Sequence, residues 1–144
     1  MSFVQKRFSQ AISASPLIMG NDLRNVSEGS KAILLSKQAI AVSQDPLGKM
    51  GRRHPSFTSD SPTQVWSRPL AGGDIAVCLY NKNNASGTDI TLKFSDLNIS
   101  GNVSILDIWA GKSLGLFDGS FTAEHVPLHD TAFLRLSPAA GVVV

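Results

Sequence analysis

Asp22 is the side chain whose type and position best suit a functional site, as a carboxylate that could contact a substrate. It comes just after the short apolar run at residues 15–20, which polar turn residues bound in the manner of a buried parallel strand. In α/β folds, functional side chains gather at the carboxyl ends of such strands. The structural alternative, which we favour, is that Asp22 and Asn21 hydrogen-bond the turn into the next helix.

Two further carboxylates and the two tryptophans have simpler structural roles. Asp45 precedes a proline in a turn-like run, and Asp107 ends a β-type run. We expect both carboxylates to accept hydrogen bonds from backbone N–H groups. Trp66 and Trp109 could stack on sugar rings, but packing within a β-sandwich core explains each more simply.

The histidines and the densest basic cluster predict neither a metal site nor a nucleic-acid site. His125 and His129 are four residues apart, but Pro127 excludes the helical face on which they could share a metal ion. The basic cluster at residues 52–54 has too few charges for a nucleic-acid footprint, in a chain of net charge +2. We expect no metal and no cofactor within this sequence.

The composition is that of a globular chain, and its cysteine usage does not indicate a cellular compartment. Hydrophobic residues make up 42% of the sequence, and no uninterrupted apolar run reaches the roughly 18 residues of a membrane span. Cys78 is the single cysteine and lies in an alternating run, so we expect a core residue in a strand. One cysteine allows no internal disulfide bond and no cysteine metal site.

Potential N-glycosylation sequons favour an exported protein. The pattern Asn-X-Ser/Thr places them at Asn25, Asn84, Asn98 and Asn102. Chance is the alternative, because the chain is rich in asparagine and serine. The N-terminus has no charged-then-apolar signal peptide, so an export signal of the parent protein would lie upstream of Met1.

The first 51 residues carry the patterns of helices around one buried strand. An apolar helical face ends before Pro16, and it is made by Val4, Phe8, Ala11 and Ile12. Ser27 is placed to cap a helix over residues 28–37, and a helical turn follows at residues 38–44. The core side of the first of these helices is expected at Ile33, Leu34 and Leu35.

Beyond a connecting loop at residues 52–62, the period of the pattern changes to two. Alternating runs lie at residues 63–68, 74–81, 88–94, 102–109, 121–126 and 131–136, with turn-like separators at 71–73, 83–87, 111–119 and 128–130. This pattern predicts a mostly β protein with an antiparallel β-sandwich of the Greek-key type. The expected core includes Val65, Val77, Leu79, Leu92, Ile105, Phe133 and Leu136.

Several motifs together resemble glycoside hydrolase family 27, the melibiases. SPLIMGNDLR at residues 15–24 resembles the family's eighth barrel strand, and AIAVSQDPLG at 39–48 resembles its closing helix and QDPLG turn. Ser43 stands where an asparagine is usual. VWSRPL at 65–70 and DIAV at 74–77 are similar to the opening hairpin of the C-terminal sandwich, and residues 107–109 and 129–136 to its closing strands.

The resemblance implies a retaining α-galactosidase that releases terminal α-linked galactose. It divides the chain into residues 1–51, the end of a (β/α)8 catalytic barrel, and residues 52–144, the C-terminal sandwich. In this family the nucleophile and the acid are aspartates on the fourth and sixth barrel strands, which would precede the first residue here. No catalytic residue is carried over, so we expect this chain alone to be inactive.

The resemblance also implies partners and a compartment for the whole protein. The partner would be an α-galactoside oligosaccharide or glycoconjugate, with no nucleic acid and no membrane. The location would be secreted, cell wall, lysosomal or vacuolar. A monomer and a homodimer are both open, as is the choice between galactose and N-acetylgalactosamine. The alternative function is a non-catalytic β-sandwich module for carbohydrate binding or domain docking.

One consequence for stability follows from an incomplete barrel. We expect the first 51 residues to be the less stable half, because the apolar faces of Phe8, Ile12, Ile33 and Leu34 would lack their neighbours. Amides at residues 17–35 would then exchange hydrogen faster than those at residues 74–79.

Overall fold

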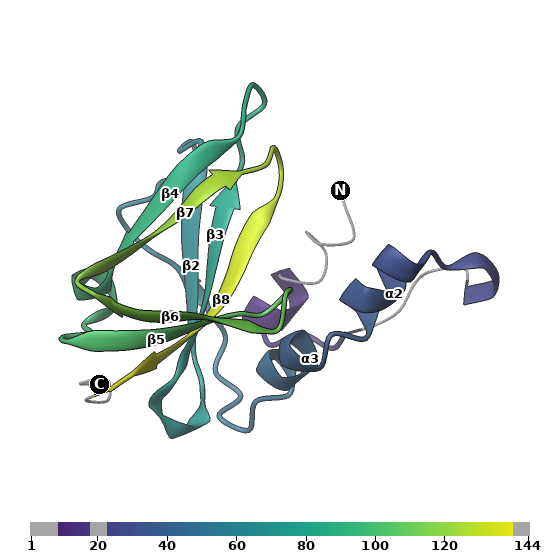
Figure 1. The fold of residues 1–144 in the computed structure, drawn as a ribbon, viewed down its shortest axis with the longest axis horizontal. Helices are drawn as coiled ribbons and strands as arrows, with labels where there is room; N and C mark the ends of the chain where they lie inside the picture. The colour runs from purple at the N-terminus through teal and green to yellow at the C-terminus, as the bar shows by residue number, and fades with distance from the viewer. Residues whose placement is uncertain (1–8, 18–22, 140–144) are drawn as a thin grey trace.

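Two antiparallel sheets form the body of the molecule. The computed structural model describes residues 9–17 and 23–139 of the chain. A six-stranded sheet has the order β1-β2-β3-β8-β5-β6, and β4 pairs with β7 in a two-stranded sheet. Figure 1 shows the strands gathered in one body, with α3 beside it and α2 farther out. The predicted β-sandwich is therefore confirmed.

The strand bounds follow the alternating runs of the sequence, with two exceptions. The first is β1, which lies within the predicted connecting loop at residues 52–62 and pairs with β2. The chain leaves β4 for the β5–β6 hairpin of the large sheet and returns as β7 beside β4, which is a Greek-key connection. The strands are β1 (Arg52–Arg53), β2 (Thr63–Pro69), β3 (Ile75–Asn81), β4 (Thr88–Lys93), β5 (Asn102–Asp107), β6 (Lys112–Asp118), β7 (Ser120–Val126) and β8 (Thr131–Pro138).

The second exception is β6, which occupies residues where a turn was predicted. Gly111, Gly115 and Gly119 gave this segment its turn-like composition. Phe117 is the one residue of β6 that is not classed as exposed, so the strand needs no apolar alternation. Gly115 has φ of 112°, and the register between β5 and β6 shifts beside it. The prediction of a turn at residues 111–119 is wrong because an exposed, irregular edge strand has the composition of a loop.

The main core lies between the two sheets. Alternate residues of β2, β3, β5 and β8 face side chains from β4 and β7, and six of the seven predicted core residues are in this cluster: Val65, Val77, Leu79, Leu92, Ile105 and Leu136. The seventh, Phe133, is also fully buried but belongs to a second cluster. The core prediction is thus confirmed for burial, with Phe133 on a different layer.

The second cluster covers the opposite face of the large sheet, which we call the outer face. Ala76, Cys78 and Phe133 contribute from β3 and β8, and Ala11, Ile12, Ala39 and Val42 contribute from the helical segments. Strand β3 is consequently buried on both faces. Cys78 is fully buried there, as the sequence predicted. Small side chains at positions 76 and 78 let a helical layer approach the strand closely.

The helical layer differs from the sequence prediction in its bounds. Residues 9–12 are helical, followed by η1 (Leu23–Asn25), α2 (Glu28–Leu34) and α3 (Lys37–Ser43). Ser36 caps the start of α3 through a hydrogen bond from the N–H of Ala39, at 3.3 Å. The helix expected over residues 28–37 is therefore interrupted before residue 37. Leu35 then lies between the helices and is 63% exposed, so its predicted place in the core is wrong.

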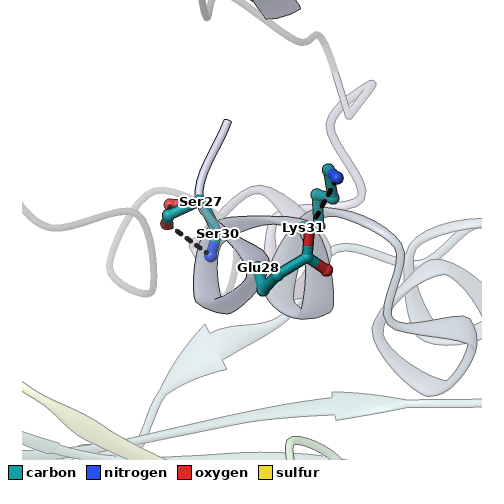
Figure 2. A network of polar contacts seen from close by, with 4 residues as sticks. All are labelled: Ser27, Glu28, Ser30 and Lys31. Carbon is teal, nitrogen blue, oxygen red and sulfur yellow. Dashed lines mark hydrogen bonds and ion pairs between the residues drawn. The ribbon is translucent and has the colours of Figure 1, made fainter. Parts of the chain in front are cut away.

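Helix α2 is held at its start by local polar contacts rather than by packing on the sheet. The hydroxyl of Ser27 accepts a hydrogen bond from the N–H of Ser30 at 3.2 Å, as the sequence predicted for a cap. Lys31 and Glu28 form an ion pair of 2.7 Å one turn apart (Figure 2). Figure 1 shows α2 projecting away from the sheets.

The predicted barrel strand at residues 15–22 lies mostly outside the described residues. Residues 15–17 are not in a strand, and residues 18–22 are not described. The division at residue 51 remains a prediction. Contacts do cross it, because Ile12 packs in the second cluster with residues of β3 and β8. Ile12 is 2% exposed and Leu34 is 6% exposed, so the expected exposure of these two side chains is wrong. Phe8 lies outside the described residues.

Candidate functional site

Arg68 is the centre of the contact between the helical layer and the large sheet. It lies on β2 and is fully buried. Its Nη1 donates a hydrogen bond to the carbonyl oxygen of Ala11. Both Nη1 and Nη2 lie 3.5 Å from the carbonyl oxygen of Ser43. One guanidinium group therefore joins the sheet to two separate helical segments.

The charge of Arg68 is balanced by helix ends and by one carboxylate. Ala11 lies near the end of the helical residues 9–12, and Ser43 is the last residue of α3. Carbonyl groups at helix C-termini carry partial negative charge and attract cations. Burial lowers the pKa of Arg68 below its usual value, and the charge of Asp45 opposes that effect. The usual value is so high that the guanidinium stays charged.

Asp45 fixes the turn after α3 to the β2–β3 hairpin. Its two carboxylate oxygens lie 2.9 and 3.1 Å from the backbone nitrogen of Ala71, and the N–H of Leu47 donates to Oδ1 at 3.0 Å. The sequence predicted that Asp45 would accept backbone hydrogen bonds, and this is confirmed. The turn is thus tied to the sheet by a carboxylate as well as by Arg68.

Gly51 brings the chain close to the helical residues before it enters β1. Its N–H donates to the carbonyl oxygen of Ile12 at 2.7 Å. A Cβ atom at position 51 would lie 2.6 Å from Cγ2 of Ile12 and 2.9 Å from the carbonyl oxygen of Ser67. Because such separations are below van der Waals contact, the approach requires glycine. We call Arg68, Asp45, Gly51 and the backbone groups they bind the joint.

The other predicted polar residues have structural positions. Asp107 accepts hydrogen bonds from the N–H groups of Trp109 at 2.8 Å and Ala110 at 2.9 Å, which confirms its predicted role. The N–H of His125 donates to Asp89 Oδ1 at 2.7 Å, where the β4–β7 register shifts. His125 and His129 are both exposed, with positive φ angles, and neither is helical.

Residues 9–17 and 23–139 contain neither a cluster of metal-ligating side chains nor a helix of membrane-spanning type. No group of three or more His, Cys, Asp or Glu side chains lies close enough to hold a metal ion. No helix in the described part of the chain has the length and apolar character to cross a membrane. The joint attaches the helical layer to the large sheet.

Two family models match the two sides of this joint. The model of the α-galactosidase C-terminal β-sandwich domain matches residues 60–136, which is more than half of the chain. The model of α-galactosidase A matches residues 4–45. The chain belongs to the α-galactosidase family. The resemblance to glycoside hydrolase family 27 is thereby confirmed.

Similar proteins support the family and show how much of them the chain covers. An α-galactosidase of Oryza sativa is 35% identical over 130 residues, which are 89% of this chain and 30% of the rice protein. The crystal structure of α-galactosidase I from Mortierella vinacea superposes with a TM-score of 0.85 at 29% identity, over 99% of this chain and 37% of that one. The chain thus spans about a third of each of these relatives.

A third protein shares the fold and has a different named substrate. A family 27 β-L-arabinopyranosidase from Geobacillus stearothermophilus has a TM-score of 0.81 at 23% identity, over 100% of this chain and 32% of that one. This likeness concerns the fold alone. It shows that this architecture occurs in an enzyme named for another sugar.

The remaining candidates from the sequence lie apart from the joint. Asp22 is outside the described residues. The sequon asparagines are all exposed: Asn25, Asn84, Asn98 and Asn102. They lie in η1, in the β3–β4 loop, at the end of η3 (Phe94–Leu97) and at the start of β5, respectively.

Arg68 lies in the VWSRPL motif, from which no role was predicted for it. The alternation along β2 nevertheless indicates one. Trp66 and Arg68 alternate with Val65 along β2, so they share the face away from the main core. A large aromatic and a cation on that face indicate that another layer covers it. The acceptors of Arg68 are backbone carbonyls, which no sequence pattern reveals.

Proposed function

We propose that this chain is the C-terminal part of a retaining α-galactosidase, in which the sandwich is fixed to the catalytic barrel through the joint at Arg68. The observation that carries the proposal is the contact between two segments that match consecutive α-galactosidase models. Residues 9–12 and α3 belong to the first match and pack on the sheet of the second.

The chemistry of a retaining enzyme assigns different roles to the missing barrel strands and to the residues of this chain. One carboxylate attacks the anomeric carbon while a second carboxyl group protonates the leaving oxygen, about 5–5.5 Å away. The resemblance assigns both groups to barrel strands that this sequence does not include. The residues of this chain would hold the end of the barrel: Arg68 and Asp45 fix the C-terminal side of α3 to β2 and the following hairpin.

The proposed substrate is an α-galactoside oligosaccharide or glycoconjugate. It rests on the names of the relatives and on the family resemblance, and the sandwich itself does not select the sugar. A chimeric enzyme tests the proposal. The corresponding C-terminal portion of the rice α-galactosidase would be replaced by this chain, and hydrolysis of p-nitrophenyl α-galactoside would be measured between pH 4 and 7.

We expect the chimera to be active and this chain alone to give no turnover above a buffer blank. An Arg68→Ala chimera should lose activity on heating faster than the unmodified chimera, because the joint is weakened. Turnover by the chain alone that survives repurification would contradict the proposal. So would a folded chimera without activity.

We also propose that the whole protein is exported and glycosylated. Exposure of all four sequon asparagines supports this, because the modification needs an accessible side chain. Expression with a secretion signal, followed by glycosidase digestion and mass spectrometry, should show a loss of mass; an unchanged mass would contradict it. A homodimer of the whole protein stays a prediction, to be checked by analytical ultracentrifugation of the chimera.

A further inference from the structure

A pocket separate from the joint lies between the helical residues and the outer face of the large sheet. Its volume is about 150 Å³. The described residues that line it are Ser9, Ile12, Ser13, Gln64, Trp66 and Tyr80. None of these side chains carries a formal charge at neutral pH.

The floor of the pocket is set by the register of β2 and β3. Gln64 pairs with Tyr80 and Trp66 pairs with Cys78, so the two aromatic residues are diagonal neighbours on one face. Such neighbours are about 7–8 Å apart, within reach of aromatic side chains. The side chain of Cys78 is small and fully buried, which leaves room beside the indole. Trp66 and Tyr80 are each only partly buried.

The indole of Trp66 is held in a fixed orientation. Its Nε1–H donates to Oε1 of Gln64 at 3.1 Å, and Gln64 is itself 7% exposed. The guanidinium carbon of Arg53 lies 6.0 Å from the centroid of the indole ring. A ring fixed on two sides is a rigid platform that loses little entropy when a ligand contacts it.

The wall of the pocket combines one apolar side chain with hydroxyl groups. Ser13 donates its N–H to the carbonyl oxygen of Ser9 at 2.9 Å, which places both residues on one side of the helical turn. Ile12 lies between them in sequence and is 2% exposed. The hydroxyl of Ser13 makes no hydrogen bond within the described part of the chain. The pocket thus has an aromatic floor and a polar edge.

We propose that this pocket binds a single neutral pyranose ring, with the apolar C–H face of the sugar against Trp66 and Tyr80. The volume suits one ring rather than an oligosaccharide. The absence of formal charge in the described lining favours a neutral ligand, and the Ser13 hydroxyl can exchange hydrogen bonds with a sugar hydroxyl. This accessory site does not depend on the catalytic function proposed above, because it is formed by residues of this chain alone.

Fluorescence of Trp66 tests the site in the full 144-residue chain. The sequence has two tryptophans, so Trp109→Phe leaves Trp66 as the single emitter. Trp109 packs on Phe133 and does not line the pocket, which makes this variant a suitable background. Titration with methyl α-D-galactopyranoside should change the emission saturably, with a Kd on the order of 1 mM, as expected for one small ring.

A second variant and two other probes separate the site from non-specific effects. Tyr80→Ser in the same background should weaken binding at least about fivefold while the circular dichroism spectrum stays unchanged. Glycerol at equal concentration should give no saturable response. The proposal is overturned if no saturation appears up to about 100 mM sugar, a hundredfold above the expected Kd. It is also overturned if glycerol gives the same response, or if phenol saturates the signal and the sugar does not.

Discussion

At the scale of single residues, Arg68 has the largest expected effect on stability. Truncation to alanine would remove this donor from the carbonyl oxygen of Ala11, which is buried, and from that of Ser43, which is half-buried. A buried group that loses its partner costs about 1–3 kcal/mol. We therefore predict that Arg68→Ala lowers the free energy of unfolding by roughly 3 kcal/mol in urea titrations.

Arg135 provides the matched control for that experiment. It pairs with Asp74 at 2.6 Å, but its side chain is 33% exposed. A partly exposed ion pair contributes about 0–1 kcal/mol, so Arg135→Gln should change stability little. Arg68→Lys should fall between the two, because lysine keeps the charge and loses the planar fork. Equal effects of the alanine and glutamine variants would show that Arg68 is not central to the joint.

Cys78 makes a separate prediction about pH. Burial raises the pKa of its thiol well above the usual value. As pH rises above about 8.5, the unfolded chain loses the thiol proton while the folded chain keeps it, so the free energy of unfolding falls. Urea titrations from pH 7 to 10 should show a steeper fall for the native chain than for Cys78→Ala. Parallel pH profiles would contradict burial of the thiol.

At the scale of elements, α2 and α3 should differ in hydrogen exchange although both have seven residues. Isolated helices of this length are unstable in water, so protection must come from packing. Ala39 and Val42 of α3 belong to the second cluster, whereas no residue of α2 belongs to either cluster. Amides of α2 should exchange far faster than those of α3.

This prediction limits the fast hydrogen exchange that the sequence predicted over residues 17–35: the fast amides are expected in α2. Arg68→Ala serves as the comparison: it should speed exchange in α3 and leave β4 and β7 protected, since those strands lie on the other side of the large sheet. Equal protection of α2 and α3 in the native chain would mean that α2 also packs on the body of the protein.

Sequence patterns predicted elements well where an apolar side chain must alternate with a polar one. They succeeded for β2, β3 and β8, which cover a core, and failed for β6, which covers almost nothing. They extended the first helix to residue 37 because the cap at Ser36 depends on a hydrogen bond from the N–H of Ala39, and serine is equally common inside a polar helical face. The sequence predicted one core for both faces of β3, because an alternating pattern does not show what packs against the second face.

At the scale of the whole molecule, both layers depend on β3. Removal of residues 1–51 would uncover Ala76, Cys78 and Phe133 on the outer face. Ile12 and Val42 are nearly fully buried, and each such side chain contributes about 1.5–3 kcal/mol. Since a domain is stable by only about 5–15 kcal/mol, residues 52–144 alone should be marginally stable.

Urea titration of residues 52–144 against the full chain measures this loss. The midpoint should fall clearly, and the truncated chain should expose apolar surface to a hydrophobic dye. An unchanged midpoint would mean that the sandwich is independent of the helical layer, as the division at residue 51 expects. The sequence could indicate both segments through family motifs, but not that their contact is carried by one arginine and two backbone carbonyls.

The irregular edge formed by β6 has a consequence for solubility. A free strand edge can pair with the edge of another molecule, and repeated pairing builds aggregates. Here Leu114 and Leu116 are 41% and 62% exposed on such an edge, which adds exposed apolar surface that favours association. The register shift beside Gly115 and its φ of 112° twist the strand away from a flat template. We therefore expect the irregular edge beside Gly115 to limit edge-to-edge association of this protein in concentrated solution.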